Sequence, residues 1–193
     1  MVGAGLTDGG VGDGQTQTMI RYGIQDYQPQ WLNSRNDITA AHARRLAALA
    51  GLTLRHVWLV WDLDDEWFTD APVLLDFGAE QVAIDHQKFD DLSVTWNTID
   101  PSRAIGDSYL HLAWRPDPLP GLIDLSGRVL DHVELLEWVG GDHDMADGSL
   151  AVGFDFAPGW LTVFNAMDEN GFEHHAPGPC YRRHPVDPMP IAP

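Results

Sequence analysis

Nearly every segment after residue 53 has a strand-like pattern, and several place apolar residues at a two-residue period, which is typical of β-strands with one buried face. In the segment 73–77 the first, third and fifth residues are apolar and share one face. The segment 81–85 follows after a short gap, so the two segments are expected to pair as a hairpin. The pattern predicts a mainly β (α+β) protein.

One segment has the composition of a helix instead. Residues 40–50 are rich in Ala, Leu and Arg, which favour helix interiors, and Gly51 follows them as a stop signal. Asp37 or Thr39 can accept hydrogen bonds from the first amides as an N-cap. We therefore expect one clear N-terminal helix at about residues 40–50.

The chain also repeats its own pattern. The spacing L-x2-L-x-G-x2-L-x-H-V-x-L begins at Leu46 and recurs 76 residues later at Leu122. Seven of its fourteen positions are identical, where about one is expected by chance. The hairpin of 73–85 has a counterpart at 152–164, so the sequence predicts one pseudo-symmetric domain built from two tandem units, each a helical turn with three strands. The predicted organisation is a flexible tail at 1–18, a single globular domain at 19–184 with repeats at about 39–92 and 118–172, and an irregular proline-rich tail at 185–193.

Charge narrows the range of partners. The chain has 29 acidic and 11 Lys or Arg residues, a formal net charge of −18. Such a field repels phosphate groups, so we expect neither nucleic acid nor a membrane surface as a partner. It attracts a basic protein, although acidity that serves only solubility is an equal alternative.

Cysteine usage and the N-terminus bear on location. Cys180 is the only cysteine, so no disulfide within the chain is expected. The first basic residue is Arg21, and no basic and apolar leader pattern precedes it. These features predict a cytoplasmic protein. Lys88 is the only lysine, a bias that suggests GC-rich coding and a bacterial source.

Two acidic loops are the candidate binding residues. The first acidic loop, 62–72, and the second acidic loop, 139–151, occupy the same place in the two units. Ten acids and one lysine lie between Asp62 and Asp91. Partner-binding residues are therefore expected to be Asp62, Asp64, Asp65, Glu66, Trp67, Phe68, Asp70, Asp142, Asp144 and Asp147.

Metal chemistry is weakly indicated, and no metal or cofactor is expected. The first acidic loop fails as an EF-hand because Trp67 stands where that loop needs glycine. Residues near the C-terminal end are of the types that bind zinc, so a zinc site there is an alternative. Their spacing matches no zinc-finger or zinc-ribbon motif, and a surface loop is the favoured interpretation. The residues of that open alternative are His174, His175, Cys180 and His184.

No catalytic motif is present, so no catalytic residue is named. The leading hypothesis is a non-enzymatic acidic binding protein that engages a basic protein partner, in its specific form an immunity-type inhibitor of a basic toxin. The alternative is a small-ligand binder or cation-dependent enzyme with a cleft between the two repeats.

Overall fold

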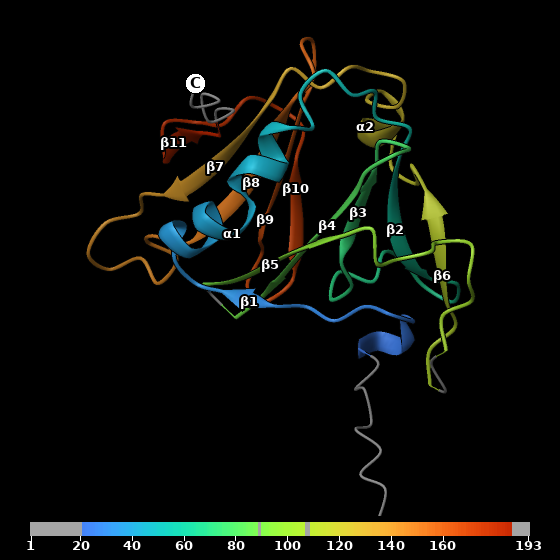
Figure 1. Ribbon diagram of the computed structural model, residues 1–193. Coiled ribbons are helices and arrows are strands. Elements are labelled where there is room, and N and C mark those ends of the chain that lie inside the picture. Colours follow the sequence, from blue (N-terminus) through green and yellow to red (C-terminus); the bar gives the residue numbers. More distant parts are fainter. Residues whose placement is uncertain (1–20, 89, 107–108, 187–193) are drawn as a thin grey trace, which may run out of the picture.

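The structure, a computed structural model, describes residues 21–88, 90–106 and 109–186. Within these ranges eleven strands form two antiparallel sheets, shown in Figure 1, which confirms the prediction of a mainly β protein. The predicted tail at 1–18 lies outside the described residues. In spatial order the first sheet contains β1 (Trp31–Leu32), β5 (Asp91–Trp96), β4 (Gln81–Gln87), β3 (Val73–Asp76), β2 (His56–Asp62) and β6 (Leu112–Pro116). The second sheet contains β10 (Asn170–Glu173), β9 (Trp160–Asn165), β8 (Leu150–Asp155), β7 (His132–Trp138) and β11 (Tyr181–Pro185).

The expected helix is present as α1 (Arg35–Ala47), which begins earlier than the sequence suggested. Ser34 is its N-cap, rather than Asp37 or Thr39, because the Ser34 Oγ accepts a hydrogen bond from the Asp37 N–H at 3.1 Å. The Asp37 carboxylate in turn accepts the Ser34 hydroxyl at 2.6 Å. This reciprocal cap satisfies a backbone N–H group of the first helical turn, so the helix begins closer to the N-terminus than expected.

The two units share one topology. The order β5-β4-β3-β2-β6 of the first sheet is repeated as β10-β9-β8-β7-β11 in the second, and β1 is an addition at one edge. Each unit therefore has five strands, two more than the three expected from the sequence. The short helix α2 (Pro120–Ile123) is the counterpart of the last turn of α1, since the two helices end 76 residues apart. A 3₁₀ turn, η1 (Arg21–Gly23), precedes both units.

Reciprocal hydrogen bonds join the units across a pseudo-twofold axis. The Gly51 N–H donates to the Leu130 carbonyl at 2.8 Å. The Gly127 N–H donates to the Leu54 carbonyl at the same 2.8 Å, and each donor and acceptor is the repeat counterpart of the other. Between them Thr53 pairs antiparallel with its own counterpart in the second unit. The two units therefore contact each other through the same segments that show the repeated sequence spacing.

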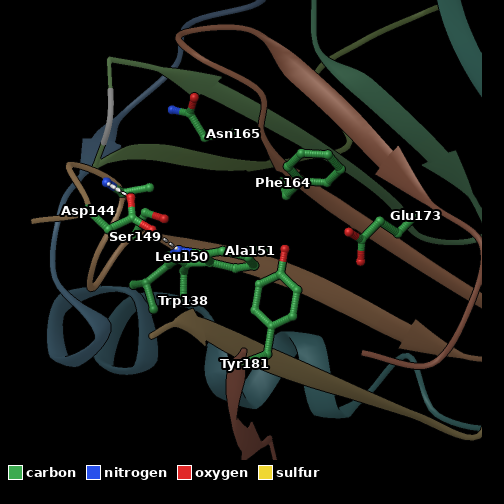
Figure 2. A pocket seen from close by; sticks show the side chains of 10 residues that line it. Trp138, Asp144, Ser149, Leu150, Ala151, Phe164, Asn165, Glu173 and Tyr181 are labelled. Carbon is green, nitrogen blue, oxygen red and sulfur yellow. Dashed lines mark hydrogen bonds between the residues drawn. The ribbon is translucent and has the colours of Figure 1, made fainter. Parts of the chain in front are cut away.

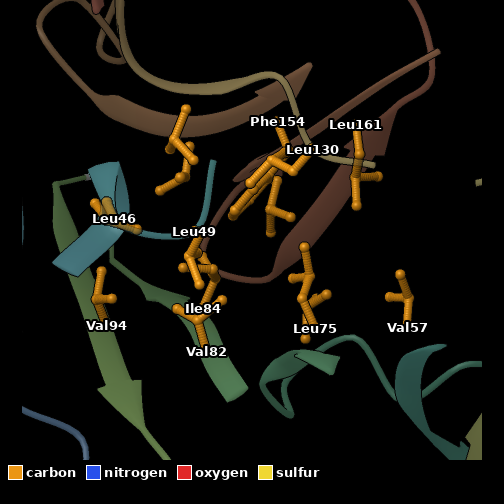
Figure 3. Packing of buried hydrophobic residues seen from close by; sticks show 14 of the residues in the cluster. Leu46, Leu49, Val57, Leu75, Val82, Ile84, Val94, Leu130, Phe154 and Leu161 are labelled. Atoms are coloured by element: carbon orange, nitrogen blue, oxygen red, sulfur yellow. The ribbon is translucent and has the colours of Figure 1, made fainter. Parts of the chain in front are cut away.

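The hairpins match as predicted. Val73 lies opposite Ile84 in the first sheet, and Val152 lies opposite Val163 in the second. The inward residues of both hairpins join one central core that also receives Leu46 of α1, and Figure 3 shows this packing. The space between the inner faces of the sheets is therefore filled by hydrophobic side chains. Predicted core residues that are buried are Val57, Leu59, Leu75, Phe77, Val133, Leu135, Phe154 and Phe156.

A buried polar network also joins the sheets. The Asn170 side-chain amide donates to the carbonyls of Thr69 and Ala71, each at 3.0 Å, and its oxygen accepts the His86 N–H at 3.0 Å. The dipeptide Asn170-Gly171 is by itself typical of a type I′ hairpin turn. The turn lies earlier, at Met167 and the residue after it, which both have positive φ. Asn170 is instead the first residue of β10 and is 1% exposed.

The outer faces of the two sheets differ. Chain segments outside the repeats cover the outer face of the first sheet, where Ile24 and Tyr27 are buried in a second cluster with Val60 and Leu74. The Tyr27 hydroxyl also donates to Asp85 at 2.7 Å. The described chain provides no counterpart of this cover on the second sheet, whose outer cluster is small and consists of Leu136, Ala151 and Trp160, flanked by Phe164 and Tyr181.

The C-terminal segment continues the second sheet before the description ends. Pro185 is the last residue of β11, and Val186 is buried and donates its N–H to the Val133 carbonyl at 3.0 Å. The remainder of the predicted proline-rich tail, 187–193, lies outside the described residues. Among the helices of the described chain, none has the length and apolar character needed to cross a membrane.

Candidate functional site

The first acidic loop is exposed but partly held by its own contacts. Asp64, Asp65 and Glu66 are exposed, and Asp62, the last residue of β2, is half-buried. The Asp62 Oδ1 accepts the Asp64 N–H at 3.1 Å, and the Asp64 carboxylate contacts the His111 ring at 2.7 Å. Part of the loop's charge therefore shapes the loop itself. Asp70 is exposed near its end.

The two aromatic residues of this loop face the protein. Trp67 is half-buried and stacks on Phe172 of the second sheet, with ring centroids 4.4 Å apart and an interplanar angle of 9°. Phe68 packs edge-on against Tyr22 at 5.6 Å. Both rings use much of their surface inside the fold, so less of it is open to a partner.

The second acidic loop is built on its own carboxylates. The Asp144 Oδ2 accepts the indole N–H of Trp138 at 2.8 Å, and the Asp147 Oδ1 accepts the Gly140 N–H at 3.0 Å. The hydrogen bond from Trp138 is the main reason why the pKa of Asp144 lies below its usual value. Asp142 is exposed at the tip. This loop carries fixed negative charge at a defined position.

The two loops do not converge. In Figure 1 the connection after β2 lies at the lower right and the connection after β7 lies at the left, with both sheets between them. The pseudo-twofold axis therefore places the loops on opposite sides of the molecule rather than around one shared face. Each loop acts as a separate acidic surface.

A hollow of about 240 Å³ opens on the outer face of the second sheet, beside the second acidic loop. Its walls include Trp138, Phe164 and Tyr181, which project from three different strands, and Figure 2 shows them around one space. The hollow has room because the strand residue between these rings is only Ala151, whose short side chain leaves the space between them unfilled. The other lining residues are Asp144, Ala146, Ser149, Leu150, Asn165 and Glu173.

The hollow contains uncompensated negative charge. Glu173 contributes a buried carboxylate oxygen, Oε2, that has no hydrogen-bond partner among the described residues. In Figure 2 this carboxylate and the Tyr181 hydroxyl point into the same space. Burial, and then the charge of Glu173, raise the pKa of Tyr181 to about 12, so its hydroxyl stays protonated and can donate a hydrogen bond. Among the described residues, the lining includes two carboxylates and no Lys or Arg.

The repeat explains why this face is open. Tyr181 occupies in the second sheet the position that Leu112 occupies in the first, and Phe164 corresponds to Asp85. In the first sheet both residues are covered by Tyr27: Leu112 belongs to the same hydrophobic cluster, and Asp85 accepts a hydrogen bond from the Tyr27 hydroxyl at 2.7 Å. The second sheet has aromatic walls where the first has a segment of its own chain laid across it.

A separate polar group lies at the other end of the second sheet. Ligand atoms of Asp131, His132 and Asp155 lie within 4.8 Å of one another, and among the described residues this is the one such set. The first unit has Arg55 at the position of Asp131, so the set is not repeated. The C-terminal candidates do not assemble: the His184 ring bonds to Glu137 at 2.7 Å, the His175 ring contacts the Ala176 carbonyl, His174 packs near Phe172, and Cys180 is exposed.

Sequence reasoning named Asp144 but missed the aromatic walls of the hollow. Phe164 and Trp138 are large side chains at outward positions of strands, and that pattern could have marked them. Tyr181 could not be found in this way, because its place depends on the pairing of β11 with β7 across more than 40 residues.

Comparisons of this chain with protein-family models, with curated proteins and with solved structures gave no match.

Proposed function

We propose that the protein is a non-enzymatic, cytoplasmic binding protein that engages a basic protein partner through the outer face of its second sheet. The observation that carries this proposal is that the outer faces of the two sheets are covered to different extents. The first is covered by the protein's own Ile24 and Tyr27, whereas the second retains an open hollow between aromatic rings. A solvent-exposed aromatic hollow beside charged loops is typical of an interaction site.

Charge indicates the kind of partner. The open face is bordered by the second acidic loop, with Asp142, Asp144 and Asp147, in a chain of net charge −18. The first acidic loop, on the other side, adds to the long-range field that draws a basic protein toward the molecule. In its specific form the proposal is an immunity-type inhibitor, whose carboxylates occupy the phosphate-binding surface of a basic toxin.

The alternative, a ligand in a cleft between the repeats, has less support. The inner faces of the sheets meet in the central core, where residues such as Leu75 and Phe154 are fully buried. A ligand there would have to displace packed side chains. The hollow on the outer face is the better location for recognition.

The test compares two substitutions that add the same charge at different places. Ala146→Arg places a cationic side chain in the rim of the hollow, and Ala79→Arg places one on the exposed turn between β3 and β4. Each immobilised variant and the native protein are incubated with lysate of the source cells at low salt. Bound proteins are identified, and the isolated partner is titrated against all three.

We expect a partner with an excess of Lys and Arg, which is released as salt rises. Ala146→Arg should weaken its binding about tenfold or more, as expected for an anchor site, while Ala79→Arg should leave it within about twofold. Unchanged thermal unfolding of both variants is the control. Equal effects of the two substitutions, or a partner without basic character, would contradict the proposal.

A further inference from the structure

We infer that the hollow on the second sheet is a receptor site for a single arginine side chain presented by the partner. This inference rests on the proposed function, because it specifies which group of a basic protein enters that face. It follows from the aromatic walls, the unpartnered carboxylate oxygen, the size of the hollow and a recurring arrangement of arginine elsewhere in the fold.

The aromatic walls suit a planar cation. Trp138 and Tyr181 meet edge to face, with ring centroids 5.1 Å apart and an interplanar angle of 77°. Such a corner presents one ring face and one ring edge to the same space, and Phe164 lies across from it in Figure 2. A guanidinium group gains from stacking on a ring face, because the ring's negative face attracts the positive charge.

The carboxylates supply the matching charge. Within the part of the chain that the structure describes, the Glu173 Oε2 is buried without a hydrogen-bond partner, which is costly for an acceptor on a charged group. A guanidinium N–H donated to this oxygen would satisfy it and form a charge-assisted hydrogen bond. Asp144 is already engaged by Trp138, so it holds the indole in place and adds negative potential at the rim.

The protein already holds two of its own arginines in this way. Arg183 lies over the Trp160 ring at 5.3 Å and bonds to Glu134 at 2.6 Å, on the same outer face of the second sheet. In the first unit, Arg45 lies 4.6 Å from the centre of the Trp96 ring and is held by Glu80, its partner at 2.9 Å. The hollow repeats the combination of indole ring and carboxylate without a cation, since no Lys or Arg of the described chain lines it.

The size of the hollow limits the occupant. Its volume of about 240 Å³ lies below the range of roughly 300–1,000 Å³ that drug-sized ligands occupy. One long side chain is therefore a better match than a cofactor or an oligosaccharide. The rings at its walls can cover the methylene groups of an arginine while the guanidinium reaches Glu173.

The experiment titrates the full-length protein with acetyl-arginine-amide and, in parallel, with acetyl-citrulline-amide. Citrulline has the same length and planar end group but no charge. Binding is followed by the NMR resonance of the Trp138 indole N–H, assigned by its loss in Trp138→Phe. We expect a saturating shift with the arginine probe at millimolar concentration and a response at least about tenfold weaker with the citrulline probe.

Two variants locate the contact. Glu173→Gln should reduce affinity for the arginine probe about tenfold, whereas Asp124→Asn removes an equal charge from the exposed C-cap of α2 and should change it less than about twofold. Equal responses to the two probes, or no response to either, would overturn the inference without any variant. If a basic partner binds the open face but the probes do not, the proposed function stands and the arginine site fails. If the arginine probe binds and no basic partner is found, the arginine site stands and the proposed function fails.

Discussion

At the scale of single residues, the most constrained group is a buried histidine. His86 is 2% exposed, and its ring nitrogens face the Asn170 Oδ1 at 3.1 Å and the Leu150 carbonyl at 3.1 Å. Burial outweighs these two acceptors and lowers the pKa of His86 from 6.5 to about 4. The ring is therefore neutral in the folded protein, and its single N–H donates to one of these two oxygens, both of which belong to the second sheet.

This histidine makes stability depend on pH. The unfolded chain binds a proton at His86 with a pKa near 6.5, whereas the folded protein does so only near 4. Between these values the unfolded state carries more bound protons, so the free energy of unfolding falls as the pH falls through this window. We expect the fall, measured by urea denaturation at a series of pH values, to be steeper for the native protein than for His86→Gln. Parallel curves for the two proteins would show that His86 does not titrate in this way.

At the scale of elements, two glycines mark the junction of the units. Gly51 and Gly127 have φ of +84° and +82°, and a Cβ atom at either position would meet nothing within 4 Å. The left-handed backbone conformation, rather than lack of space, is thus what favours glycine at both.

The pseudo-twofold axis predicts equal costs at these positions. Gly51→Ala and Gly127→Ala should each lower the free energy of unfolding by about 1–2 kcal/mol, the usual cost of a non-glycine residue in this conformation. Chemical denaturation measures both. Gly78→Ala, where the new Cβ would also meet the Arg55 side chain at 2.4 Å, serves as a comparison that adds a steric contact. Markedly unequal costs at Gly51 and Gly127 would argue against equivalent junctions.

Elements that depend on local pattern could be predicted, and those that depend on distant pairing could not. The pattern in 73–85 and its counterpart predicted both hairpins and their inward residues, because the inward side chains of such a strand are the apolar ones. The strands β6 and β11 were missed because each pairs across a long connection with the first strand of its unit. The start of α1 was missed because Ser34 and Asp37 form a cap that outweighs the weaker helix propensity of the residues between them.

The candidate site was predicted only in part. The acidic loops were identified from composition, and Asp144 does border the hollow. Trp67 was expected to contact a partner because acidic residues surround it in the sequence. That local pattern does not show that its ring stacks on the distant Phe172. The aromatic hollow itself arises from strands distant in sequence, so no local pattern shows it.

At the scale of the whole molecule, the chain contains two similar sheets with different exposed surfaces. The reciprocal bonds at the junction hold the copies in a symmetric arrangement. Segments outside the repeats then break that symmetry, since Ile24 and Tyr27 cover one outer face. Among the described residues, none covers the aromatic hollow of the second sheet in the way that Ile24 and Tyr27 cover the first sheet. We therefore propose that the outer face of the second sheet, rather than that of the first, binds the partner.

Hydrogen–deuterium exchange of the full-length protein, alone and bound to its isolated partner, tests that claim most directly. The account predicts slower exchange on binding in the second acidic loop and in the strands around the hollow, 160–173 and 181–185. Exchange in 21–30, which covers the first sheet, should be unchanged. Protection confined to 21–30 or to the first acidic loop, with none around the hollow, would contradict the account.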